Sequence, residues 1–175
     1  AANLVAPTST RFHREWVQGQ QLFKTIGCAG CHVEMLVLKS PIFRTRSAIS
    51  GQLLEIDLSR QGEVPRIQYD TQLQGYPVWL FSDLKRHDLG QESASRHDDH
   101  GVPPQHYLTR RLWGLAKSPP YFHDGRAPWF DHAVAAHGGE ASKSKNTFVG
   151  LSYEEKAALR VYLLSLTRHR RIIVP

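Results

Sequence analysis

The stretch Cys28-Ala29-Gly30-Cys31-His32 decides how this chain is interpreted. Two cysteines separated by two residues and followed directly by histidine form the attachment signature of a c-type haem. Each thiol can form a thioether bond to a haem vinyl group, and the adjacent imidazole can reach the iron. The sequence contains 2 cysteines, so the motif uses every thiol of the chain. We therefore predict one covalent haem c, attached through Cys28 and Cys31, with His32 as the proximal iron ligand.

Two other uses of a Cys-x-x-Cys pair fit the surrounding sequence less well. A redox dithiol of the thioredoxin type opens a helix after a buried strand. Residues 14–27, which precede the motif, instead have the apolar spacing of an amphipathic helix that stops at Gly27. A structural zinc site needs further cysteines or a closely spaced histidine pair. The sequence favours a haem site over a dithiol or a zinc site.

Composition is that of a globular protein, with 41% hydrophobic and 22% charged residues among 175. No apolar run is long enough to span a membrane. The formal net charge of +6 favours docking to an acidic redox partner, which another haem-bearing subunit could provide. We do not expect nucleic-acid binding, because the basic residues are scattered and no recognition motif accompanies them.

Covalent attachment of haem normally takes place outside the cytoplasm. We therefore expect a periplasmic or otherwise extracytoplasmic bacterial protein, from which a leader was removed or which was cut from a longer polypeptide. Residues 1–13 are predicted to form an extended arm, residues 14–167 a single haem domain, and residues 168–175 a basic tail. The two ends of the haem domain carry the clearest helical patterns.

The last helix is predicted from a capping box formed by Ser152 and Glu155, followed by one apolar stripe. The stripe consists of Leu159, Tyr162, Leu163 and Leu166. A helix near the N-terminus, the haem motif and an amphipathic C-terminal helix are the arrangement of a cytochrome c domain, in which the terminal helices cross beside the haem. We predict a mainly α, cytochrome c-like fold with long loops. Residues 33–38 and 53–58 suggest a small β-hairpin excursion, 82–106 a long loop, and 109–117 and 128–137 short helices.

The sixth iron ligand is not fixed by local sequence. Met35 lies three residues after His32 and would stay on the same side of the haem plane, so we expect it to be a core residue. Among the 10 histidines, His123, His132 and His137 lie far enough along the chain to reach the opposite face. Spacing alone leaves these three open.

Four stretches occur in a specific order: FSDLKRHDLG (81–90), LWGL (112–115), SPPYFHDGRA (118–127) and AVAAHGGEA (133–141). Together they resemble the C-terminal haem domain of bacterial di-haem oxidoreductases, which are related to di-haem cytochrome c peroxidases. The resemblance covers roughly residues 15–167. It implies that the sixth ligand is His137, which would give bis-histidine, low-spin iron and an electron-transfer role.

The resemblance also assigns residues to the surroundings of the haem. It places His123 near the haem edge and makes Arg126 a partner for a propionate. Four aromatic side chains would pack on or near the macrocycle: Trp113, Tyr121, Phe122 and Trp129. Relatives usually carry two haem motifs, whereas this sequence has one. The alternative function is therefore an electron-relay subunit or fragment of a di-haem peroxidase, with the catalytic haem on another chain or on a missing segment.

Overall fold

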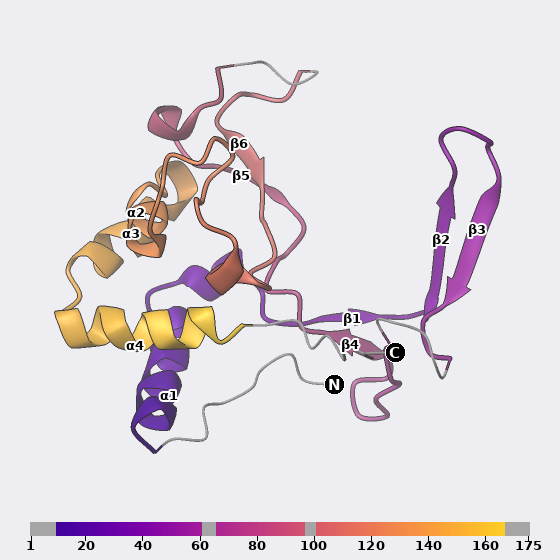
Figure 1. The fold of residues 1–175 in the computed structure, drawn as a ribbon, viewed down its shortest axis with the longest axis horizontal. Coiled ribbons are helices and arrows are strands. Elements are labelled where there is room, and N and C mark those ends of the chain that lie inside the picture. Colours follow the sequence, from indigo (N-terminus) through magenta and orange to yellow (C-terminus); the bar gives the residue numbers. More distant parts are fainter. Residues whose placement is uncertain (1–9, 61–65, 97–100, 167–175) are drawn as a thin grey trace. The chain divides into compact units, whose positions relative to one another are not determined.

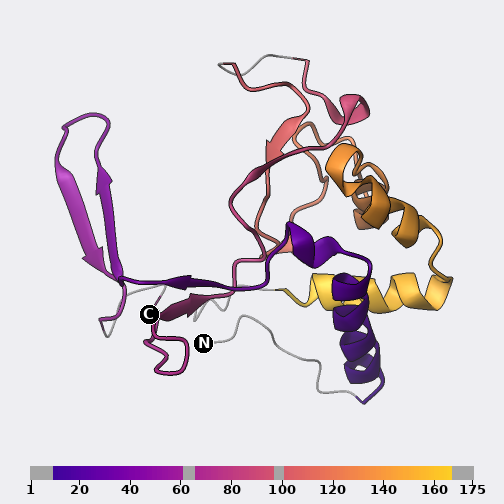
Figure 2. The ribbon, with the colours of Figure 1, turned by 180° about the vertical axis from the view of Figure 1, so that it is seen from behind.

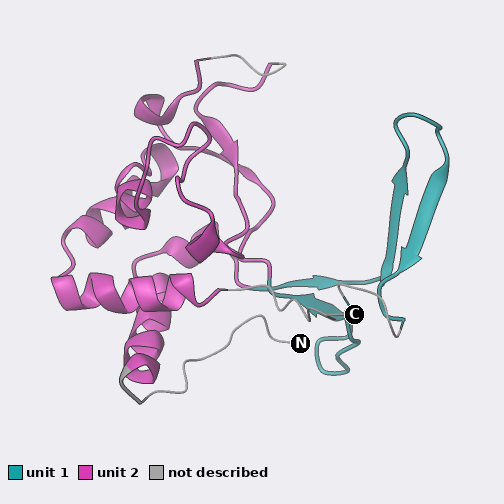
Figure 3. Ribbon diagram, in the orientation of Figure 1, with its two compact units in different colours: residues 1, 35–79 teal, residues 2–34, 80–175 magenta. Residues whose placement is uncertain are grey.

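The computed structural model describes residues 10–60, 66–96 and 101–166, which divide into two compact units (Figure 3). One unit comprises residues 35–79, and the other contains the haem motif together with everything from residue 80 onward. The predicted basic tail and most of the predicted N-terminal arm lie outside the described residues. No helix in the described part of the chain is long and apolar enough to cross a membrane.

The larger unit is organised by two helices that cross, α1 (Thr10–Thr25) and α4 (Tyr153–Leu164), as both views show (Figures 1 and 2). Gly19 lies at the crossing, where a Cβ would overlap the backbone carbonyl of Ala158. The helices can approach this closely because the residue at the contact has no side chain. The predicted crossing of the terminal helices is confirmed, although α1 begins at Thr10 rather than at residue 14.

Three aromatic rings fill the space between the crossed helices and the segment that follows the smaller unit. Phe23 of α1 lies 5.5 Å from Tyr162 of α4 and 6.1 Å from Phe81, measured between ring centroids. All three side chains are almost completely buried. The Tyr162 hydroxyl donates a hydrogen bond of 2.9 Å to Glu34, which also pairs with Lys24. This core fixes the residues on both sides of the haem motif.

The predicted capping box of the last helix is confirmed. The Glu155 backbone N–H donates to the Ser152 hydroxyl, and the Ser152 N–H donates to the Glu155 carboxylate. All four residues of the predicted apolar stripe are buried. The sequence pattern of this helix therefore corresponds to its packing.

Short elements connect the crossed helices. The first three residues of the haem motif form a 3₁₀ turn, η1 (Cys28–Gly30). Further along the chain, β5 (Arg86–Asp88) pairs antiparallel with β6 (His106–Leu108). The helices α2 (Phe130–Ala135) and α3 (Ser142–Val149) follow, joined through η4 (Gly139–Ala141). Two further 3₁₀ turns among the described residues are η2 (Gln91–Ser93) and η3 (Leu115–Lys117).

The smaller unit contains two antiparallel strand pairs. The strands β2 (Ile42–Arg46) and β3 (Leu53–Asp57) form a hairpin, whereas β1 (Leu36–Leu38) pairs with β4 (Tyr76–Val78). Of the two runs expected to form the excursion, residues 53–58 supply β3 and residues 33–38 supply β1. The two runs pair with other segments rather than with each other.

The prediction of a mainly α fold is wrong. The described residues are 36% helical and 19% strand, and they form three small antiparallel sheets and four α-helices. The predicted long loop 82–106 contains β5, whose residues Arg86–Asp88 carry no strand-forming pattern and are extended because they pair with β6. The expected helix 109–117 is reduced to η3, because Gly114 has a left-handed backbone with φ 76°. The expected helix 128–137 is similarly shortened to α2.

Candidate haem site

The haem motif lies on a tight turn that follows α1. Gly27 has a φ of 96°, which glycine adopts without strain, and the His32 N–H donates to the Cys28 carbonyl at 3.0 Å. Burial raises the pKa of the Cys28 thiol to about 11. The pKa of Cys31 is also raised, first by burial and then by the carboxylates of Asp83 and Glu140. Redox dithiols react as thiolates, so these raised pKa values disfavour a redox dithiol.

No group of three or more metal-ligating side chains forms a cluster within the described ranges. The histidines are therefore considered individually as candidate iron ligands. Both His32 and His137 are partly buried, and both make a hydrogen bond to the backbone.

His32 is held by the segment that carries Phe81. Its Nδ1 lies 3.1 Å from the Phe81 carbonyl oxygen. A carbonyl can only accept, so Nδ1 must carry the proton and Nε2 keeps its lone pair. Burial lowers the pKa of His32 to about 4, although the backbone carbonyls of Phe81 and Arg110 oppose this shift. His32 is therefore neutral at physiological pH, which is the form that binds iron.

His137 is held in the same way just beyond the end of α2. Its Nδ1 lies 2.6 Å from the Ala133 carbonyl oxygen, which leaves its Nε2 lone pair available. Burial lowers the pKa of His137 as well. A charge on His137 further lowers the pKa of His32, so the two imidazoles lie within electrostatic reach of each other. Residues that are 105 positions apart in sequence thus share one region of the larger unit.

Three of the other described histidines, at positions 87, 123 and 132, are less suited to binding iron. Both ring nitrogens of His87 face carboxylates, and the His123 ring stacks on Tyr107 with centroids 4.9 Å apart. His132 is exposed on α2. His97 and His100 lie outside the described residues. The geometry thus favours His137 over His123 and His132, which spacing alone had left equivalent.

The predicted aromatic residues lie in different surroundings. Phe122 packs edge-on against His137 with ring centroids 5.8 Å apart, and the Tyr121 hydroxyl donates to the Leu115 carbonyl. Trp113 is partly buried, whereas Trp129 is 69% exposed. Phe122 thus contacts a predicted ligand directly.

Arg126 already has two protein partners. Its guanidinium contacts the Asp124 carboxylate at 2.7 Å and donates to the Glu92 carbonyl at 2.7 Å. A surface hollow of about 400 Å³ is lined by Ser95, Arg96, His123, Asp124 and Arg126. The predicted propionate partner thus lies beside His123, with part of its charge compensated by Asp124.

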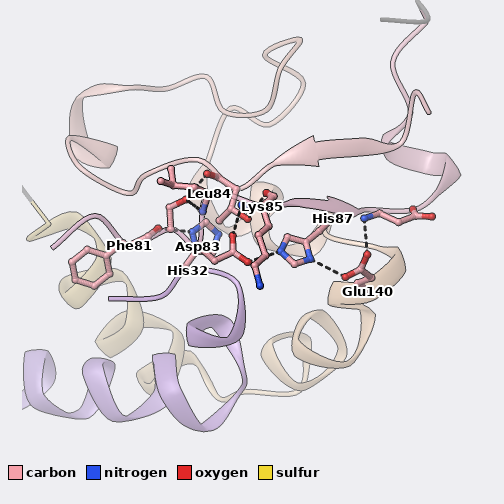
Figure 4. Close-up of polar contacts among 10 residues, drawn as sticks. His32, Phe81, Asp83, Leu84, Lys85, His87 and Glu140 are labelled. Carbon is pink, nitrogen blue, oxygen red and sulfur yellow. Dashed lines mark hydrogen bonds and ion pairs between the residues drawn. The ribbon is translucent and has the colours of Figure 1, made fainter. Parts of the chain in front are cut away.

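The sequence reasoning missed a cluster of three charged side chains: Asp83, His87 and Glu140 (Figure 4). The spacing of Asp83 and His87 could have suggested a local pair. Glu140 lies 53 residues after His87, so no local signal could have added it.

Residues 3–166 match the protein family described as "Di-haem oxidoreductase, putative peroxidase". No curated protein matches the sequence. The match spans the crossed helices, the haem motif and both predicted iron ligands.

Proposed function

Since this chain belongs to the di-haem oxidoreductase family, whose description indicates haem binding and a redox role, we propose that it is an electron-transfer cytochrome domain with a single covalent haem. One observation carries the proposal. The imidazoles of His32 and His137 are both buried enough to be neutral, and both have Nδ1 fixed on a backbone carbonyl. Hydrogen bonds made by the ring nitrogen that does not bind the metal orient metal-binding histidines and increase their basicity.

Each residue has a defined role in this proposal. Cys28 and Cys31 would hold the haem through thioether bonds, and the Nε2 lone pairs of His32 and His137 would bind its iron. A bis-histidine haem supplies an iron that cycles between Fe(III) and Fe(II). The chain holds both ligands in one tautomer by backbone contacts, so neither needs to move when the charge of the site changes. Phe122 packs against His137, and Arg126 is the proposed propionate partner.

A second candidate function is an electron-relay subunit or fragment of a peroxidase. The family is described as di-haem, whereas the 2 cysteines of this sequence supply one attachment motif. In this alternative, the catalytic haem belongs to another chain or to a segment outside this sequence. Both candidates assign the same electron-carrying role to the haem of this chain.

The proposal also includes an extracytoplasmic location and an acidic redox partner. Haem attachment to cysteine pairs is an extracytoplasmic process, and the net charge of +6 would speed encounter with an anionic surface. The rate of reduction by an acidic redox protein should fall as the salt concentration increases. If the rate does not depend on the salt concentration, the positive charge of the protein does not speed its encounter with the partner.

The ligand assignment is tested by the spectra of the holoprotein. Ferric wild-type protein should be six-coordinate and low-spin, and its ferrous form should not bind carbon monoxide. His137→Ala should become high-spin and bind carbon monoxide. His132→Ala, an exposed position on α2, serves as the control and should keep the wild-type spectrum. A high-spin wild type would overturn the carrier function, and an unchanged His137→Ala spectrum would reassign the sixth ligand.

A further inference from the structure

The His87 side chain on β5 is held between two carboxylates (Figure 4). Its Nε2 lies 2.8 Å from an Asp83 oxygen, and its Nδ1 lies 2.8 Å from a Glu140 oxygen. A neutral imidazole would direct a lone pair at one of these carboxylates, so the geometry requires the doubly protonated ring. The His87 and Asp83 side chains are 18% and 11% exposed, so water screens this pair only partly.

Asp83 belongs to the segment that supports the proximal ligand. Its backbone N–H donates to the Cys31 carbonyl at 2.9 Å. Two residues earlier, Phe81 accepts the hydrogen bond from His32. Although burial opposes ionisation, the Lys85 amide and the His87 ring hold the pKa of Asp83 at about 2. A permanent negative charge therefore lies next to the haem motif.

Glu140 belongs to the segment that follows His137. Its other carboxylate oxygen accepts from the Asp88 N–H at 3.0 Å, and the Gly138 N–H donates to the Leu89 carbonyl at 3.1 Å. A Cβ on Gly139 would overlap the Asp88 carbonyl, so this segment packs directly against the end of β5. His87 thus links the segment that supports His32 to the segment that carries His137.

The charges of this cluster act on the haem motif. Both carboxylates raise the pKa of Cys31, so both are close enough for their charge to be felt there. With His87 protonated, the three side chains carry a net charge of −1. Without the positive charge of His87, the two negative charges of Asp83 and Glu140 would remain beside Cys31. Negative charge stabilises Fe(III) relative to Fe(II), which lowers the reduction potential.

We propose that His87 is a positioning residue that links the segment supporting His32 to the segment carrying His137, and that it raises the haem reduction potential by compensating Asp83 and Glu140. The inference rests on the proposed function, because it assumes a haem attached at Cys28 and Cys31. Charge compensation distinguishes it from a purely structural role: the potential should follow the net charge of the cluster, whichever residue is changed.

The test is a spectroelectrochemical titration of the holoprotein near pH 6, with four proteins compared. The cluster charge is −1 in the wild type, −2 in His87→Gln, 0 in Glu140→Gln and −1 in the double variant. We expect His87→Gln to shift the iron equilibrium about tenfold toward Fe(III), which corresponds to about 59 mV for one electron. Glu140→Gln should shift it in the opposite direction, and the double variant should return close to the wild type. His132→Gln is the control for replacing a histidine outside the cluster.

The inference is overturned if the potential of His87→Gln is equal to or above that of the wild type, or if the double variant lies below His87→Gln. If His87→Gln does not fold, Glu140→Gln alone tests the inference. An unchanged or lower reduction potential in Glu140→Gln would then contradict it. A wild type without a low-spin spectrum would refute the proposed function instead. Unchanged potentials in a low-spin wild type would refute this inference while leaving the proposed function intact.

Discussion

Replacing Gly19 with alanine tests the helix crossing around which the larger unit is built. A Cβ at this position would overlap the Ala158 carbonyl oxygen and lie 2.8 Å from the Tyr162 Cβ. Carbon atoms pack best at about 3.5–4.0 Å, so the helices would have to move apart by about 1 Å. The obstacle is helix backbone, which cannot rotate away as a side chain can.

The size of the effect follows from two opposing contributions. Overpacking of a tight contact lowers the free energy of unfolding by about 1–3 kcal/mol. The better helix propensity of alanine offsets about 1 kcal/mol of this loss. Because the colliding atoms belong to backbone, we expect the upper part of the range and a net loss of about 2 kcal/mol. Separation of the helices would also loosen the contact between Phe23 and Tyr162, whose ring centroids lie 5.5 Å apart.

The assay is denaturant unfolding of the holoprotein, monitored by far-UV circular dichroism and by the haem absorbance. Gly150→Ala is the matched control, since Gly150 has a helical backbone and a Cβ there would make ordinary contacts of 3.6 and 3.7 Å. It should be neutral or slightly stabilising. If Gly19→Ala were as stable as the wild type, the close approach at the crossing would not be what positions α1 against α4.

Two further predictions concern stability. Ser152→Ala removes the capping box of α4 and should cost about 0.5–2 kcal/mol in chemical unfolding; an unchanged midpoint would show that the cap contributes nothing. The second concerns pH: hydrogen bonds to Glu140 and Asp83 raise the pKa of His87 above its ordinary 6.5, and the pKa of Asp83 falls from 3.8 to about 2. The stabilisation that protonated His87 provides is thus fully present below about pH 6.5 and is lost as the pH rises through the pKa of His87 in the folded protein. The stabilisation that ionised Asp83 provides is present above about pH 4 and is lost as the pH falls through its lowered pKa. The stability difference between the wild type and His87→Gln should therefore be largest between about pH 4 and 6.5 and shrink on either side; a difference independent of pH would contradict the charged pair.

The mainly α prediction failed in the region between the terminal helices. Residues 36–38 pair with 76–78, although the intervening chain also contains the β2–β3 hairpin. Short apolar runs indicate extended structure but do not specify a partner, because each pairing adds only a few backbone hydrogen bonds. The register of these strands depends on contacts that no local pattern encodes.

The sequence by itself determined the features that contiguous residues encode. Gly27 begins the turn that carries Cys28 to His32, and the cap and apolar stripe of α4 follow from spacing within one helix. Propensity, capping and periodicity act over a few residues, so they can be recognised without a partner.

Tertiary structure decided the features that join distant residues. It brought His137 within electrostatic reach of His32, gave both rings the same tautomer, and placed Glu140 against His87. The tautomer of an imidazole depends on which carbonyl meets Nδ1, and its charge depends on burial and on neighbouring carboxylates. These neighbours come from other segments of the folded chain, so the sequence could supply the residue types of the site but not their protonation or their partners.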